Sequence, residues 1–98
     1  MGDEVDDEFY ERADAHIKLS NDQMANARRG VVSASMMYAT ARFNAYVSAC
    51  NASSKQELAD KKEQTIEYFT NQYRLVLAEN IDDYVARYDE SMKVDPQS

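Results

Sequence analysis

Apolar residues recur at helical spacing along most of the chain, and this pattern predicts three long helices. The first helix is predicted to begin near Asp6, which can cap it, and to run to about Ala27. Its inward face carries mostly apolar and small residues together with the only histidine of the chain: Phe9, Ala13, His16, Ile17, Ser20, Met24 and Ala27. Gly30 is expected to end this helix, because glycine turns the chain freely.

The second predicted helix, residues 31–50, is apolar on two sides. A bulky stripe runs from Val32 to Cys50, and a second stripe, mostly alanine, runs from Ala34 to Ala49. A helix that is apolar on two sides is covered on both, so this helix is expected to be the central one. The connections before and after it are short, which favours antiparallel neighbours.

A third helix is predicted to begin at Ser54, which forms with Glu57 the Ser-x-x-Glu pattern of a capping box. Apolar residues keep helical register from there to Met92. A continuous helix of this length would span about 57 Å, roughly twice the length of the other two. Asn80 followed by Asp83 resembles a helix cap, so a kink or break is expected near Asn80.

The predicted fold is therefore all-α: an antiparallel three-helix bundle with a long C-terminal helix kinked or broken near Asn80. A chain of 98 residues can build one modest core. Two glycines and one proline favour long helices over a turn-rich β fold. We expect a single domain over residues 8–92, preceded by an acidic leader at 1–7 and followed by a tail at 93–98.

Negative charge is concentrated at the N-terminus. Residues 3–14 hold seven acids and one base, which gives −6 of the total charge of −7. These acids suit the positive end of a helix dipole, and the alternative is a docking tail for a basic partner. The remainder is nearly neutral and has no basic stripe, so nucleic acid is not expected as a partner.

Membrane insertion and secretion are not expected either. Residues 31–50 are long enough to span a bilayer, but six of them are too polar for hydrocarbon: Ser33, Ser35, Thr40, Arg42, Asn44 and Ser48. The acidic N-terminus does not resemble a secretory signal, and a single cysteine gives no internal disulfide. We expect a cytoplasmic protein, in which the glycosylation sequon at Asn51 is a chance match.

Arg42 is the one charged residue of the second predicted helix. In antiparallel helices, residues at equal distances along the chain from the connecting turn lie at the same level. This places His16, across the first expected turn, and Glu63, across the second, at the level of Arg42. In one interpretation Arg42 pairs with Glu63 or Glu67 and fixes the register of two helices, because an unpaired buried charge would be costly. In the other, Arg42, His16, Tyr38 and Glu63 form a site for a small anionic ligand, with catalysis as an option. Both interpretations stay open.

Signals for other chemistry are weak. A carboxylate-bridged metal bundle needs Glu-x-x-His on two helices, and His16 is the only histidine. Two glycines cannot supply a glycine-rich phosphate loop, and no nucleophile-elbow motif occurs. We therefore expect no metal, no cofactor and no enzymatic activity, with a serine–histidine–carboxylate triad as the open alternative.

Aromatic residues gather on one side of the C-terminal helical region. They are Phe69, Tyr73, Tyr84 and Tyr88. They can pack inside the bundle with their hydroxyls at its rim, or they can form an interface, since tyrosine combines a large contact area with a polar group. A homodimer would cover them without any other partner, so the expected partner is a second copy or an unidentified protein.

Three segments together resemble a known family: "EFYERADAHIKLSND", "SASMMYATARFNAYVSA" and "EYFTNQYRLVLAENIDDYVARY". The family is a small bacterial one catalogued only as a domain of unknown function, family 3144, and the resemblance covers roughly Glu8 to Tyr88. Its most specific part is "YATARFNAYV", which contains Arg42 and Asn44. The resemblance implies a bacterial, soluble, all-helical protein, and it brings no activity, cofactor or catalytic residue.

Overall fold

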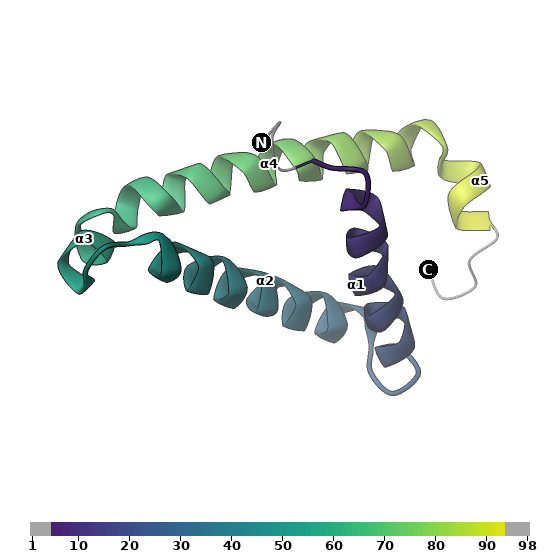
Figure 1. Cartoon of the computed structure of the whole chain (residues 1–98). Coiled ribbons are helices and arrows are strands. Elements are labelled where there is room, and N and C mark those ends of the chain that lie inside the picture. Colours follow the sequence, from purple (N-terminus) through teal and green to yellow (C-terminus); the bar gives the residue numbers. More distant parts are fainter. Residues whose placement is uncertain (1–4, 94–98) are drawn as a thin grey trace. The chain divides into compact units, whose positions relative to one another are not determined.

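The computed structural model describes residues 5–93, and every regular element in this range is an α-helix (Figure 1). The helices are α1 (Phe9–Gln23), α2 (Arg29–Asn51), α3 (Lys55–Asp60), α4 (Lys62–Ala86) and α5 (Tyr88–Lys93). The prediction of an all-α fold is confirmed. Residues 1–4 of the expected leader and 94–98 of the expected tail lie outside the described residues.

The chain divides into two units, Met1–Cys50 and Asn51–Ser98. The first unit contains α1 and almost all of α2, and the second contains α3, α4 and α5. The side-by-side packing of three helices and the single domain at residues 8–92 stay predictions.

α1 begins at Phe9, later than the cap predicted at Asp6. The Phe9 backbone N–H donates to the Asp6 carbonyl oxygen at 3.1 Å. The Asp6 carboxylate instead accepts a hydrogen bond from the Arg12 guanidinium at 2.7 Å, and this bond lowers the pKa of Asp6 from its ordinary value. Asp6 is thus paired with a side chain rather than with the free N–H groups of the first turn, so the predicted cap is wrong.

Gly30 does not end the first helix, contrary to the prediction. α1 ends at Gln23, and tight bonds between residues three apart follow, such as Met24 N–H to the Asn21 carbonyl at 3.2 Å. Gly30 lies in the first turn of α2, and no glycine of the described chain has a positive φ. Its freedom to adopt a left-handed conformation is therefore not used.

Burial in the first unit is greatest near the turn between its two helices. Val32 is 5% exposed and is the one buried side chain among the described residues. Ser20 and Met36 are half-buried, and the Ser20 hydroxyl lies 3.6 Å from the Met36 sulfur, which joins α1 to α2. All three belong to the faces predicted from spacing, so those faces meet at this end of the two helices.

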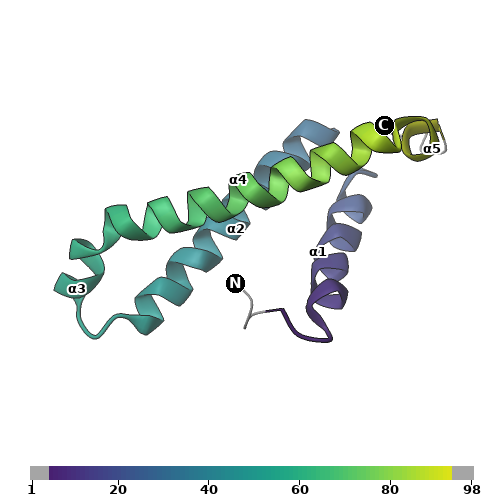
Figure 2. The same cartoon turned by 90° about the horizontal axis from the view of Figure 1, so that it is seen from above.

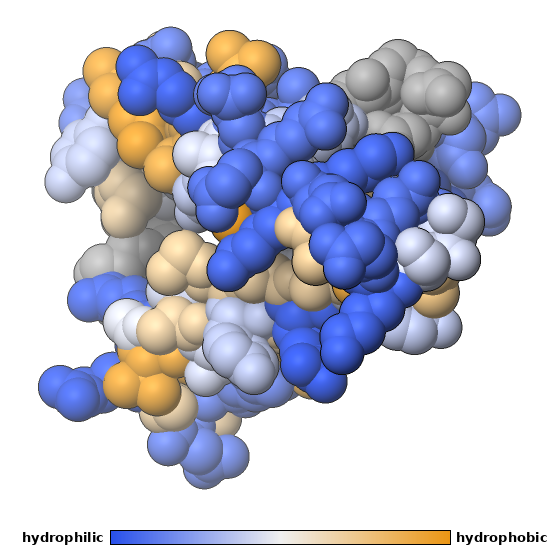
Figure 3. Space-filling view, turned by 90° about the vertical axis from the view of Figure 1, so that its left-hand side faces the viewer, coloured by the Kyte–Doolittle hydropathy of each residue, from blue (hydrophilic) through white to orange (hydrophobic). Residues whose placement is uncertain are grey.

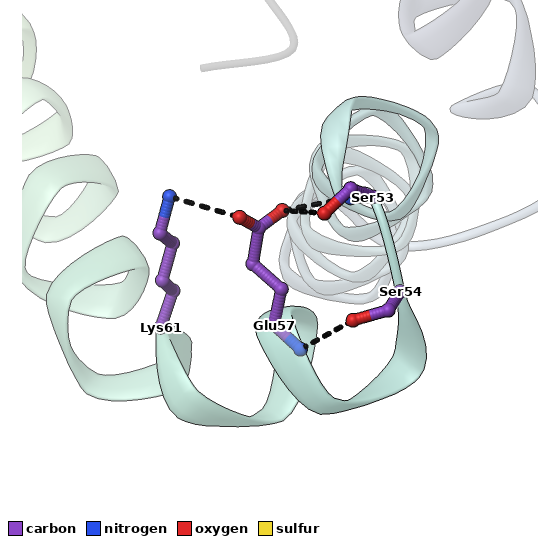
Figure 4. A network of polar contacts seen from close by, with 4 residues as sticks. All are labelled: Ser53, Ser54, Glu57 and Lys61. Atoms are coloured by element: carbon purple, nitrogen blue, oxygen red, sulfur yellow. Dashed lines mark hydrogen bonds and ion pairs between the residues drawn. The ribbon is translucent and has the colours of Figure 1, made fainter.

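The capping box predicted at Ser54 is present (Figure 4). The Glu57 backbone N–H donates to the Ser54 hydroxyl at 3.1 Å. The Glu57 carboxylate reaches back one residue further than in the usual box, and accepts from the Ser53 N–H at 2.7 Å and the Ser53 hydroxyl at 3.1 Å. Lys61 adds an ion pair at 3.7 Å. This network orders the start of α3.

α4 is continuous through Asn80, so the chain is not broken there, and the alternative of a kink stays a prediction (Figures 1 and 2). The Asn80 side-chain amide donates to the Val76 carbonyl within the same helix at 2.8 Å. The helix ends instead at Ala86, and Arg87 has φ −120° and ψ 32°. A second interruption falls at Lys61, with φ −94° and ψ 6°, so the single long helix predicted from residue 55 is three helices.

We expect Gly30→Ala to raise the free energy of unfolding by about 0.5–1 kcal/mol, because alanine restricts the unfolded chain and favours a helix. There is room for the change, since an added Cβ would meet nothing within 4 Å. Urea denaturation followed by circular dichroism measures the effect. A loss of stability would show that Gly30 needs a left-handed backbone, as the sequence pattern suggested.

Glu57 should make stability depend on pH. Hydrogen bonds from the Ser53 backbone and hydroxyl, then the charge of Lys61, lower the pKa of Glu57 from its ordinary 4.5. The folded pKa is thus below the unfolded one, so this stabilisation is present above pH 4.5 and is lost as pH falls through the folded value.

We therefore expect Glu57→Gln to lose less stability than the unsubstituted protein when pH is lowered from 6 to 3 in urea titrations. Glu67→Gln is the matched control, because no hydrogen bond or ion pair joins Glu67 to the described residues. Equal pH dependence in all three proteins would contradict the role given to Glu57.

Candidate functional site

One face of α4 carries a stripe without charged side chains. At about 100° per residue, eight residues between Ile66 and Tyr84 lie within about 60° of one line along its surface. We call them the α4 stripe: Ile66, Phe69, Thr70, Tyr73, Leu77, Asn80, Ile81 and Tyr84. Lys62 and Glu63, in the first turn of α4, lie in the same arc just before the stripe begins. The other acidic and basic residues of α4 lie outside the arc, so the stripe is a mainly apolar surface with two neutral polar positions.

The stripe is open to solvent along most of its length. Its large apolar members are all exposed except Phe69, which is half-buried and packs edge-to-face on Tyr68 with ring centroids 5.2 Å apart. Leu77 is 42% exposed. Because α4 is uninterrupted from Lys62 to Ala86, these side chains form one continuous line rather than two short ones. An apolar surface of this kind is typical of an interaction site.

Three of the four residues predicted to form an interface belong to this stripe: Phe69, Tyr73 and Tyr84. The fourth, Tyr88, is exposed but begins α5, beyond the end of α4 at Ala86. In Figures 1 and 2 the chain turns away from the axis of α4 at this point. The aromatic line therefore stops at Tyr84, and the role of all four residues as an interface stays a prediction.

A second exposed aromatic group lies on α2 and was not predicted as an interface. Phe43 and Tyr46 are both exposed, and their ring centroids are 6.0 Å apart. They belong to the bulky stripe that begins at the buried Val32. The helical spacing of these two residues is visible in the sequence, but the sequence analysis predicted that the whole stripe lies inside the bundle.

The predicted ligand-site residues are divided between the two units. His16 lies on α1, Tyr38 and Arg42 lie one turn apart on α2, and Glu63 lies in the second unit, on α4. His16, Tyr38 and Arg42 are exposed, and within the described chain no hydrogen bond or ion pair links them. The anionic-ligand site and the Arg42–Glu63 pair both stay predictions.

Two kinds of feature do not occur among the described residues. No group of three or more histidine, cysteine, aspartate or glutamate side chains in residues 5–93 is placed to hold a metal ion. Over the same range, none of the helices combines the length and the apolar character that crossing a bilayer requires.

Comparison with known proteins gives a family and a fold. The sequence model described as "Protein of unknown function (DUF3144)" matches residues 9–85. This agrees with the family and the range suggested by the sequence motifs. The chain is also similar to a solved structure, the "NMR structure of the protein NB7890A from Shewanella sp", with 33% identity and a TM-score of 0.76. The similarity covers 93% of this chain and 97% of that one. No curated protein matches.

We expect Arg42→Ala to change the free energy of unfolding by less than about 0.5 kcal/mol, because an exposed side chain without partners contributes little. Chemical denaturation measures this change, with Arg74→Ala on α4 as the control. A loss above about 1 kcal/mol would instead favour the register-fixing pair, since removing one member leaves the other unpaired. A double-mutant cycle with Glu63→Ala would then measure the coupling.

Proposed function

This chain belongs to the family of proteins of unknown function DUF3144, and we propose that it is a non-enzymatic module that associates with itself through exposed helix faces. The family description names no reaction. A bacterial, cytoplasmic setting is part of the proposal, and the similar protein from a Shewanella species supports the bacterial part.

The observation that carries the proposal is the small amount of burial. Val32 is the one buried side chain of the described chain, whereas large apolar residues of α1, α2 and α4 are exposed. Figure 3 shows hydrophobic residues at the surface among hydrophilic ones. Single exposed apolar residues are ordinary in proteins, but a continuous stripe such as that of α4 is not.

Neither unit has an extensive core among its described residues. In the first unit one side chain is buried, and in the second no described side chain is. Most helix stability in proteins comes from packing an apolar face, not from the intrinsic preference of the residues. Association supplies that packing.

We expect light scattering on a sizing column to give at least twice 11.2 kDa at micromolar concentration. Leu77→Glu should raise the dissociation constant at least about tenfold, because it places an unpaired charge in the interface. Leu75→Glu is the matched control, since Leu75 lies on the opposite face of α4 and is 64% exposed. A monomeric mass at every concentration would overturn the proposal, and equal effects of the two substitutions would remove the α4 stripe from it.

A further inference from the structure

We propose that the α4 stripe is covered by the α4 stripe of a second copy, in an antiparallel pair with a two-fold axis at the level of residue 75. This inference rests on the proposed self-association and specifies which surface forms the interface and in which direction. The covering element is thus a second copy of this chain, not a different protein.

Any arc of an α-helix has the same spacing in both directions, so the informative feature of the stripe is the type of residue at each pair of exchanging positions. Reversal about position 75 exchanges Ile66 with Tyr84, and Tyr73 with Leu77. It also exchanges Phe69 with Ile81, and the two polar members of the stripe with each other, as Thr70 and Asn80. Each apolar position thus maps onto an apolar position, and each polar position onto a polar one. A symmetric interface requires this self-complementarity, because the same surface serves both copies.

The side-chain volumes also favour the antiparallel direction. In that arrangement each aromatic ring lies at the level of an aliphatic side chain of the second copy, as with Tyr84 and Ile66. Alternation of large and small residues across an interface lets the two layers interdigitate. A parallel pair in register would instead bring Tyr73 against Tyr73 and Tyr84 against Tyr84, with aliphatic residues against one another elsewhere.

Asn80 fits this interface despite being polar. Its amide already donates to the Val76 carbonyl of its own helix at 2.8 Å, so part of its hydrogen-bonding capacity is satisfied before association. The Thr70 hydroxyl of the second copy would lie at the same level and can hydrogen-bond with the remaining amide atoms. A polar position inside an apolar interface favours one register, because a shifted pair would bury it against apolar groups.

The continuity of α4 makes the pairing geometrically straightforward. From Ile66 to Tyr84 the stripe spans about 27 Å along an uninterrupted helix. Both interruptions, at Lys61 and Arg87, lie outside this range. The apolar side chains of the stripe therefore extend over the whole length of the proposed interface.

Cysteine cross-linking tests the direction and the register. All variants carry Cys50→Ser, which removes the exposed native thiol. An equimolar mixture of Ile66→Cys and Tyr84→Cys chains should form a disulfide-linked dimer under mild oxidation. Ile66→Cys alone should not, because its two copies would be about 27 Å apart along the axis. Leu75→Cys, on the opposite face, is the negative control, and helicity and the reduced mass confirm that each variant folds and associates.

Each outcome is decisive. A dimeric mass with cross-linking only in the mixed sample, on a non-reducing gel, supports the antiparallel pair. A dimeric mass with cross-linking of Ile66→Cys to itself indicates a parallel pair and overturns this inference while the proposed self-association stands. A dimeric mass without any α4 cross-link places the interface elsewhere, for instance on the α2 aromatic pair. This result also overturns the present inference while the proposed self-association stands. A monomeric mass overturns both.

Discussion

Helix faces that are apolar must be covered, because an isolated helix in water is at best marginally stable. In this protein burial is greatest around Val32, where α1 and α2 are joined by a short turn. The aromatic pair of α2 and most of the α4 stripe are exposed. The proposed self-association would cover the longest of these surfaces, which lies on one uninterrupted helix.

The two interruptions of the C-terminal helical region set the limits of that surface. Lys61 and Arg87 leave the α-helical conformation, and between them α4 runs without a break. Both residues also pair with an acidic residue four positions earlier, Glu57 and Asp83 respectively. Exposed pairs of this kind contribute little to stability. The charges of these two pairs lie near the two ends of α4 and are not members of the stripe.

Sequence patterns predicted the helical class, the start of α3 and the face of α4, and they failed where one residue type has two uses. Asn80 with Asp83 has the spacing of a cap, but the Asn80 amide bonds back to Val76 and Asp83 pairs with Arg87, so both are satisfied inside a helix. Gly30 can end a helix or sit in its first turn, and the choice depended on where α1 had already ended. The ligand-site prediction reached across two turns, and spacing alone does not fix such contacts.

A surface that binds a different protein need not have the same pattern of apolar and polar residues in both directions along the helix. The α4 stripe has such a pattern, both in its apolar residues and in its two polar ones, Thr70 and Asn80. Helical periodicity alone repeats apolar positions every three or four residues. Helix geometry makes the positions of the stripe symmetric about residue 75, but it does not determine that the two polar residues exchange with each other or that each aromatic residue exchanges with an aliphatic one. This symmetry is the property that a second copy of the same helix requires.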